Sequence, residues 1–550
     1  MDGVEVIRRY HEQTSHWPGA RPRDHVVSGF RPMAPDNQPS PFKRYRGLDR
    51  EPLPAELRPP RDAPVALDVL AGRHQSTRPA VADRVVLARL LYFSAGVTRF
   101  SSRGRGRAWF RASASAGNLH PLELYVAWGP QLGLDEGLYH FDPESFSLAR
   151  LRTTDVRPHL AHAVGDAALA AAPAVIVVTG LPWRTTWKYS ERGWRHVFWD
   201  AGSLLANLLA VADAQGVSTR VALGFVDRQV SHIVGIDGVA EFPVAAVAVG
   251  PAAADTTPTT HPSDLDEIRP DVEPLSRDPV EFPLVTAAQL ASDLDSSETV
   301  ARWRAAGADD GSRTGTATAR DGAENVEPSD VAENGEPVET LILRRGSTRL
   351  MERVILPGAA LEWVLRSATR SAPLDAIAPG GSLLSYLLTI HAVEGHEAGL
   401  YRWSGSTLEL RTSGEEASTR ELSASLCLGQ PLGGDSAYTV FECADLSEVL
   451  DVLGPRGYRA AHVEAGLVNG RLLLCAHALG HGATGLTFFD EAVRAAFETP
   501  ASCLLVTAIG APAYRPTPGG WPGEPVELAR YDALMTRLET GLHRRPVTGR

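Results

Sequence analysis

The sequence predicts an α+β fold that is built twice within one chain of 550 residues. Two segments carry the repeat: residues 190–216 read SERGWRHVFWDAGSLLANLLAVADAQG, and residues 454–480 read GPRGYRAAHVEAGLVNGRLLLCAHALG. Equivalent arginines and glycines in these segments stand 264 positions apart, and an earlier pair, RHQSTR from Arg73 and RRGSTR from Arg344, stands 271 positions apart. Similar segments in the same order, at a nearly constant offset, indicate a duplicated structural unit.

Each copy combines a long helix with short buried strands. We expect the helix to begin near Asp200 in the first copy and near Glu464 in the second. A loop containing glycine follows, and a fully apolar run that suits a buried strand closes each copy, at Gly250 and at Gly510. Further strands are predicted at residues 122–128, 175–180 and 387–393. Helices interleaved with a few strands of this kind are typical of an α+β sheet domain.

The composition divides the chain into four parts. Residues 1–60 are rich in proline and predict an irregular arm that wraps around the rest. Residues 61–286 and 341–550 are the two copies, and residues 287–340 between them are acidic, poor in aromatic residues and without an apolar period. Because such a segment buries too little apolar surface to offset the entropy of ordering it, we expect a flexible linker.

Charge and cysteine content argue against several classes of function. The net charge is -12 at pH 7, which disfavours a general surface for nucleic acid or anionic membranes. The four cysteines form no CxxC motif and predict neither a metal site nor a disulfide framework. The N-terminus lacks the apolar core of a signal peptide, and the apolar stretch at residues 167–180 is shorter than the roughly 20 residues of a membrane helix. We therefore expect a cytoplasmic protein without a metal.

The segment RRGSTR is a candidate anion site, with Arg344, Arg345, Ser347 and Arg349 as its polar residues. Guanidinium groups and a hydroxyl that alternate along a short segment can converge on one phosphate. A solvated basic turn explains the motif equally well when it stands alone. The duplication is what favours the phosphate interpretation.

A run of small residues precedes the strand at residues 122–128. Ser115, Ala116 and Gly117 are followed by Asn118. Small side chains let backbone amides approach a flat ligand, and an asparagine amide can bond the edge of its ring. A tight turn into the strand also explains the small residues, but it does not explain Asn118 and the Leu-His-Pro that follows.

Two adjacent residues, Lys188 and Tyr189, are candidates for moving a proton. A lysine can lower the pKa of a neighbouring tyrosine, and the pair can accept a proton from a substrate. From the pattern alone, a surface dipeptide is the commoner explanation. A glycine-rich loop further along the chain contains Leu486 and Thr487 and could pass over a flat cofactor.

In this order, these elements resemble the nitroreductase family of flavoproteins, and more narrowly the SagB-type dehydrogenases of thiazole- and oxazole-modified peptides. The early YHEQTSH from Tyr10 is similar to the N-terminus of that subfamily. The resemblance implies two fused nitroreductase-like, FMN-dependent domains that form an intramolecular pseudo-dimer, with FMN at the interface. It assigns the flavin phosphate to the RRGSTR segment, the flavin edge to residues 115–118, and catalysis to Lys188 and Tyr189.

The two copies have diverged in a way that predicts one FMN per chain. The second copy has Arg345 where the first has His74, and it has Arg515 after its last strand, where the family places a basic residue near the phosphate. The first copy keeps residues 115–118 and the Lys-Tyr pair. At these positions the second copy reads Pro379-Gly380-Gly381-Ser382 and Val452-Leu453. One composite site therefore inherits every intact part.

The resemblance also implies a reaction, the oxidation of a thiazoline or oxazoline ring in a ribosomally made peptide. Backbone donors near Leu486 and Thr487 would stabilise charge on the reduced flavin, and oxygen would reoxidise it. The implied partners are the precursor peptide and an upstream cyclodehydratase, and further association of two chains stays open. The alternatives are an NAD(P)H-dependent nitro- or quinone reductase of the same fold, and a non-catalytic scaffold subunit of a peptide-modifying complex.

Overall fold

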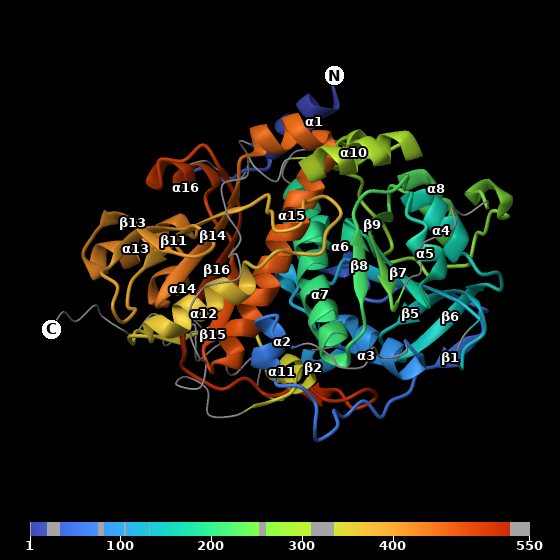
Figure 1. The fold of residues 1–550 in the computed structure, drawn as a ribbon, viewed down its shortest axis with the longest axis horizontal. Helices are drawn as coiled ribbons and strands as arrows, with labels where there is room; N and C mark the ends of the chain where they lie inside the picture. Colours follow the sequence, from blue (N-terminus) through green and yellow to red (C-terminus); the bar gives the residue numbers. More distant parts are fainter. Residues whose placement is uncertain are drawn as a thin grey trace.

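Two long helices, one from each half of the chain, lie side by side at the centre of the protein (Figure 1). They are α7 (Gly193–Gln215) and α15 (Leu446–Ala478). In this computed structural model, residues 2–18, 34–74, 82–103, 106–130, 133–251, 260–309 and 335–528 are described. Both central helices begin earlier than the sequence predicts, and α15 contains a kink at Gly454 (φ 58°), directly before Pro455.

The two central helices touch through glycines. A Cβ atom added to Gly202 would lie 2.1 Å from the carbonyl oxygen of Val463, and one added to Gly466 would lie 2.2 Å from that of Trp199. Gly466 and Val463 are the counterparts of Gly202 and Trp199 in the repeat. The same glycine contact is therefore made twice, once from each helix to the other. Such reciprocity is characteristic of a two-fold arrangement.

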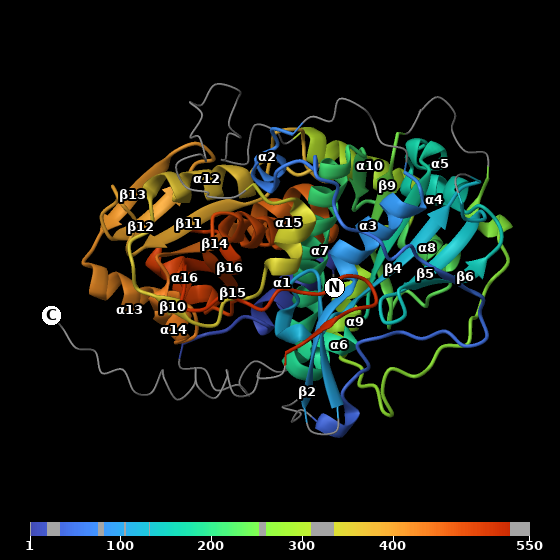
Figure 2. The same cartoon turned by 90° about the horizontal axis from the view of Figure 1, so that it is seen from below.

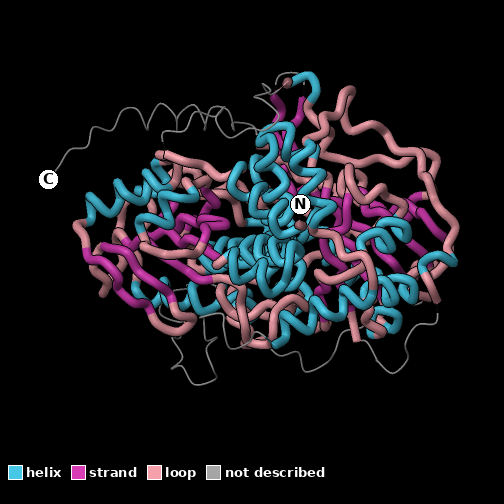
Figure 3. The backbone as a smooth tube through the Cα atoms, turned by 90° about the horizontal axis from the view of Figure 1, so that it is seen from above, coloured by secondary structure: helices cyan, strands magenta, loops and turns pink. Residues whose placement is uncertain are grey.

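A separate sheet flanks the helices on each side (Figures 1 and 3). The first has the strand order β1-β6-β5-β4-β7-β9-β8, and the second has the order β10-β16-β14-β11-β12-β13, with β15 also paired to β16. The strands of the first sheet are β1 (Arg50–Pro52), β4 (Leu122–Trp128), β5 (Gly137–Asp142), β6 (Ser147–Arg152), β7 (Ala174–Gly180), β8 (Thr219–Ala222) and β9 (Phe242–Val249). Those of the second are β10 (Met351–Glu352), β11 (Ser385–Ile390), β12 (Gly399–Trp403), β13 (Leu408–Ser413), β14 (Tyr438–Ala444), β15 (Gly482–Leu486) and β16 (Ser502–Pro512).

The predicted strands are confirmed. The predicted strand at 122–128 is β4, residues 175–180 lie in β7, and residues 387–393 overlap β11. The apolar runs that close the two copies form β9 and β16. Every residue of β4, β7 and β9 is buried, which is why these strands read as continuous apolar segments.

The other helices cover the sheets and the central pair (Figure 1). They are α1 (Gly3–Gln13), α2 (Ala66–Leu70), α3 (Arg84–Ala95), α4 (Arg157–Val164), α5 (Ala168–Ala171), α6 (Trp183–Tyr189), α8 (Asp227–Val234), α9 (Pro283–Ala291), α10 (Ser297–Asp309), α11 (Val338–Arg344), α12 (Gly358–Ala368), α13 (Glu416–Leu426), α14 (Pro431–Asp435) and α16 (Asp490–Ala496). The span Trp183–Gln215 is long and apolar enough to cross a membrane, but 94% of its apolar window is buried inside the protein. This span was not predicted from the sequence as a long apolar stretch, because charged residues interrupt it.

The chain near the C-terminus crosses to the first half. There β17 (Val526–Glu527) pairs in parallel with β2 (Val97–Arg103), which pairs with β3 (Gly106–Arg111) in a three-stranded sheet (Figure 2). The approach is fixed by hydrogen bonds from Gly519 N to the Leu343 carbonyl and from Gly520 N to the Thr98 carbonyl. Segments from both halves therefore meet beside the β2–β3 hairpin.

Two of the predicted boundaries are wrong. The arm at residues 1–60 begins with helix α1, whose Ile7 and Tyr10 are fully buried, although much of residues 34–60 is irregular. The segment predicted as a linker from residue 287 contains most of α9 and all of α10, which bury Ala288 and Trp303. The apolar face of α9 begins before residue 287, so the compositional boundary divided it. Residues 310–334 of the expected linker lie outside the described residues.

Two clusters of buried ion pairs join the halves reciprocally. Two arginines where α7 begins, and two just after the kink in α15, bind an aspartate that begins a short helix of the other half, α16 or α8. The pairs are Arg192–Asp490 (3.1 Å), Arg195–Asp490 (2.9 Å), Arg456–Asp227 (2.8 Å) and Arg459–Asp227 (3.0 Å). Removing one member would leave a buried charge without its partner, which is costly. These pairs therefore fix the loop before α16 against α7, where the cavity described next is formed.

Candidate functional site

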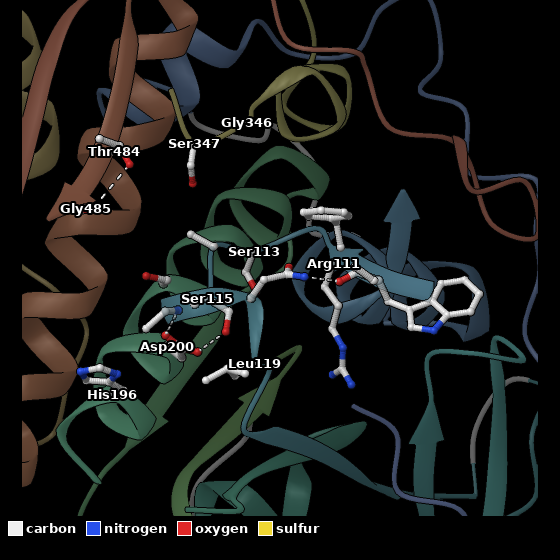
Figure 4. Close-up of a pocket in the computed structure, with 18 of the residues that line it drawn as sticks. Arg111, Ser113, Ser115, Leu119, His196, Asp200, Gly346, Ser347, Thr484 and Gly485 are labelled. Atoms are coloured by element: carbon white, nitrogen blue, oxygen red, sulfur yellow. Dashed lines mark hydrogen bonds between the residues drawn. The ribbon is translucent and has the colours of Figure 1, made fainter. Parts of the chain in front are cut away.

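A cavity of about 1970 Å³ opens between the two halves (Figure 4). Its walls come from the irregular segment at residues 38–41, the β2–β3 hairpin, residues 113–119, α6 and α7 of the first half. The second half contributes residues 345–349, 484–488 and 514–517. Ligand pockets are commonly about 300–1,000 Å³, so this volume has room for a flavin-sized cofactor and a further group.

Twelve of the thirteen predicted site residues line this one cavity. They are Ser115, Ala116, Gly117, Asn118, Lys188, Tyr189, Arg345, Ser347, Arg349, Leu486, Thr487 and Arg515. In Figure 4, Ser347 and Ser115 come from opposite halves and face the same space. The structure thus brings the residues together, while their roles in binding and catalysis stay predictions.

Arg344 does not line the cavity, contrary to the sequence interpretation. Its guanidinium binds the carboxylate of Glu336 and donates a hydrogen bond of 2.7 Å to the carbonyl of His477. Arg344 is the last residue of α11, and the chain leaves the helix at Arg345. The two adjacent side chains therefore point in different directions, which the sequence did not reveal.

Two buried arginines form a cationic wall at one end of the cavity. Arg345 donates a hydrogen bond of 2.7 Å to the Ala112 carbonyl. Arg99, on β2, donates to the carbonyls of Thr517 (2.7 Å) and Arg345 (3.1 Å). No carboxylate among the described residues forms an ion pair with either arginine. The pKa of both is lowered to about 10, for Arg99 by burial and for Arg345 by burial together with the charge of Arg99.

Two like charges that are buried together without a carboxylate suit an anionic ligand, because an anion would offset their repulsion and their lost hydration. Arg99 is not among the residues that the sequence predicts for the site. It stands in a basic segment, RFSSRGRGR, whose alternating arginines could have raised the possibility of an anion-binding hairpin. Its approach to Arg345 depends on a contact between residues 246 positions apart.

Lys188 and Tyr189, at the end of α6, face the backbone of Gly117. A Cβ atom added to Gly117 would lie 2.5 Å from the Tyr189 hydroxyl and 3.2 Å from Lys188 Nζ. Gly117 also has φ 64°, a left-handed conformation that favours glycine. Both observations favour glycine here, and the short distances place residues 115–118 and the Lys-Tyr pair in one wall of the cavity.

The electrostatic surroundings separate the roles of these two residues. Burial, and then the nearby charge of Arg349, lowers the pKa of Lys188, so its amine loses a proton more readily than a solvated lysine. Burial, and then the charge of Asp200, raises the pKa of Tyr189 to about 12, so its phenol stays protonated at neutral pH. Lys188 is therefore the better proton acceptor and Tyr189 the better hydrogen-bond donor.

The amide of Asn118 is engaged within the protein. Its Nδ2 donates to the Trp109 carbonyl at 2.7 Å, and its Oδ1 lies 2.9 Å from His120 Nε2. These bonds connect the loop to β3. The predicted contact between Asn118 and a ring edge is untested, and the observed bonds give the residue a role in holding the loop.

The second potential site, formed by the same parts with the halves exchanged, has a different loop. Asp200 accepts hydrogen bonds from Ser115 Oγ (2.5 Å) and from the next backbone amide, and Glu464, 264 positions later, accepts the same pair of bonds from Ser382 Oγ (2.7 Å) and the amide after it. Ser382 is thus the counterpart of Ser115, and the predicted match of residues 379–382 with 115–118 is wrong by three positions. Only two residues separate Ser382 from its strand, so the loop is shortened.

The second potential site is also filled by protein. Asp375 accepts hydrogen bonds from the backbone amides of Leu223 (2.6 Å) and Gly224 (3.2 Å), and its carboxylate pairs with Arg304 of α10 at 2.6 Å. The ring of the adjacent Trp303 lies 2.8 Å from where a Cβ of Gly224 would be. Beside Ser382 a void of only about 30 Å³ remains, enough for one or two water molecules.

The amides that Asp375 binds correspond to predicted site residues of the open cavity. Leu223 and Gly224 stand four and three positions before Asp227, as Leu486 and Thr487 stand before Asp490. In the filled site these amides hold a carboxylate. From this correspondence in sequence position, we expect the amides of Leu486 and Thr487 to suit an electron-rich group of a ligand.

Comparisons with known proteins agree with this fold. The model of the nitroreductase family matches residues 73–251. A curated relative, a putative nitroreductase of Methanocaldococcus jannaschii, is 32% identical over 165 residues, which are 30% of this chain and 78% of the relative. The structure of a putative nitroreductase from Anabaena variabilis is similar with a TM-score of 0.68 at 23% identity, and the match covers 92% of this chain and 99% of that chain.

The chain belongs to the nitroreductase family. It is a nitroreductase-family oxidoreductase with an α+β fold, and members of this family generally use FMN. The likeness to the Anabaena protein extends over both halves and concerns the fold alone. Within the described residues, no group of three or more His, Cys, Asp or Glu side chains could hold a metal ion, and all four cysteines are free and buried.

Proposed function

We propose that the chain is an FMN-dependent dehydrogenase that oxidises azoline rings in a ribosomally made peptide, and that its two halves form an intramolecular pseudo-dimer with one FMN site. The reciprocal contacts of α7 and α15 support the pseudo-dimer. The donor set of the cavity fits FMN: Arg99 and Arg345 suit its phosphate, and the cavity volume exceeds that of one cofactor. The proposed reaction also implies a cyclodehydratase that makes the ring beforehand.

The single observation that carries the reaction type is the position of Lys188 and Tyr189 against Gly117, inside the cavity. Aromatising an azoline removes one hydrogen as a hydride and one as a proton. FMN supplies the acceptor for the hydride. In this proposal Lys188, whose pKa is lowered by burial and by Arg349, takes the proton, and the Tyr189 hydroxyl holds the ring or the peptide by a hydrogen bond.

The test uses the purified full-length chain loaded with FMN and a synthetic peptide that carries one thiazoline. We expect a product lighter by two hydrogen atoms, formed in air without added nicotinamide cofactor. Rapid bleaching of the flavin by NADPH, with no change in the peptide, would instead identify a nitro- or quinone reductase. A chain that takes up no FMN would favour the scaffold subunit.

The filled second site predicts a stoichiometry. Titration of the apo-protein with FMN, followed by the quenching of flavin fluorescence, should reach saturation at one FMN per chain. The physical reason is that Asp375, Arg304 and Trp303 occupy the space and the backbone amides of the second potential site. Saturation at two FMN per chain would contradict the composite site.

A further inference from the structure

A buried carboxyl group lies directly behind the loop that faces the proposed flavin site. Asp200, on α7, is 5% exposed and lines the cavity. Its Oδ2 accepts the hydroxyl hydrogen of Ser115 at 2.5 Å, and its Oδ1 accepts the backbone N–H of Ala116 at 3.0 Å (Figure 4). No arginine or lysine among the described residues forms an ion pair with Asp200.

The hydroxyl of Ser115 has only one hydrogen, and the ionised carboxylate uses it. Ser115 Oγ also accepts the backbone N–H of His120 at 2.9 Å, which leaves one lone pair. When Asp200 is protonated, its own O–H can donate to that lone pair. The Ser115 hydrogen is then released and can be donated to a ligand in the cavity, because Ser115 itself lines the cavity wall.

Asp200 is in an environment that lets this change happen near neutral pH. Burial raises the pKa of Asp200 to about 7, although the hydrogen bonds from Ser115 and Ala116 oppose the shift. Around it, Tyr189 on α6 keeps its proton, and the buried ring of His196, one turn earlier on α7, has a pKa well below its usual value. The side chains of Lys188 and Arg349 line the same cavity.

We propose that Asp200 and Ser115 form a proton-controlled hydrogen-bond donor in the wall of the flavin site, with the Ser115 hydroxyl turned to the ligand when Asp200 is protonated and turned to Asp200 when it is ionised. The proposal rests on the proposed flavin binding. It makes Asp200 a positioning residue, because Asp200 acts through Ser115. One proton moves onto the carboxyl, and no electron is transferred in this step.

The duplicated chain supplies a matched control. Glu464 binds Ser382 and the following amide in the same way, and burial raises its pKa to about 7 as well. Next to Ser382, however, the void is only about 30 Å³. Replacing the Glu464 carboxyl by an amide therefore makes the same chemical change as at Asp200, but at a place with no room for a flavin.

The experiment measures the affinity for riboflavin by fluorescence quenching, between about pH 6 and about pH 8, on either side of the Asp200 pKa. Riboflavin is the probe because it lacks the phosphate, whose own titration near pH 6 would interfere. We expect the wild-type affinity to fall about fivefold as pH rises, the value of one ordinary hydrogen bond.

The variants separate this mechanism from a structural role. Asp200→Asn should bind as tightly at both pH values as the wild type does at the lower one, because the Asn amide can donate to Ser115 permanently. Ser115→Ala should bind weakly at both. Glu464→Gln should keep the wild-type dependence.

The outcomes also distinguish the two proposals. A wild-type affinity for riboflavin that does not change with pH, in a protein that binds FMN, would overturn the inference and leave the proposed function standing. A pH dependence that survives in Asp200→Asn would overturn it as well. A wild-type chain that binds neither flavin at any pH would overturn the proposed function, and this inference with it.

Discussion

Replacing Lys188 by alanine should lower the rate of peptide oxidation by between about 100- and 10,000-fold, the range that a positioned proton acceptor contributes, while FMN stays bound. Lys188 Nζ faces Gly117 in the cavity, and burial together with Arg349 lowers its pKa. The neutral amine that this environment favours is the form that accepts a proton. The measurement is single-turnover reduction of the flavin by the thiazoline peptide, with flavin absorbance as the check that the cofactor is present.

The pH dependence and a matched variant make this prediction specific. Because the neutral amine is the active form, the wild-type rate should rise with pH until Lys188 is deprotonated, and this rise should be lost in Lys188→Ala. Val452 stands 264 positions after Lys188, in the half whose equivalent site is filled, so Val452→Ala should react like the wild type. A fully active Lys188→Ala variant would exclude the assigned role.

The parts of the fold that the sequence predicted are those with strong local patterns. The duplicated helices carry a repeat with glycines at the contact, and the buried strands are continuous apolar runs. Helix α9 was missed because the compositional boundary at residue 287 divided its apolar run, and helix α10 was missed because it lies in a polar stretch. The burial of Ala288 depends on α1, which packs against α9, and the burial of Trp303 depends on α15, which packs against α10.

In the candidate site, too, strong local motifs were predicted and contacts between distant residues were not. Motifs that combine several residue types, such as RRGSTR and the Lys-Tyr pair, predicted twelve residues that line one cavity in the structure. Single charged residues were missed or wrongly assigned, because their function depends on where their side chains point in the folded protein. Arg99 reaches Arg345 from strand β2, and Asp200 reaches Ser115 from helix α7. Arg344 and Arg345 are adjacent in the sequence, but helix α11 ends between them, and their side chains therefore point in different directions.

Arg345 is the residue whose loss should most weaken the binding of FMN. It is buried, carries no carboxylate partner among the described residues, and lies beside Arg99 at the cavity wall. Removing one member of a buried, hydrogen-bonded charge pair costs about 2–5 kcal/mol, which corresponds to a loss of affinity of roughly 30- to several thousand-fold. Arg345→Ala should therefore raise the dissociation constant of FMN by at least the lower of these factors, measured by fluorescence titration.

The neighbouring arginine is the sharpest control for this prediction. Arg344 binds Glu336 and the His477 carbonyl outside the cavity, so Arg344→Ala should leave the FMN affinity unchanged. Riboflavin should bind Arg345→Ala nearly as well as it binds the wild type, since the lost contact is to the phosphate. Equal losses for FMN and riboflavin would show that Arg345 holds the shape of the cavity and does not bind the phosphate. A loss in Arg344→Ala as large as that in Arg345→Ala would mean that the cationic wall is not where the phosphate lies.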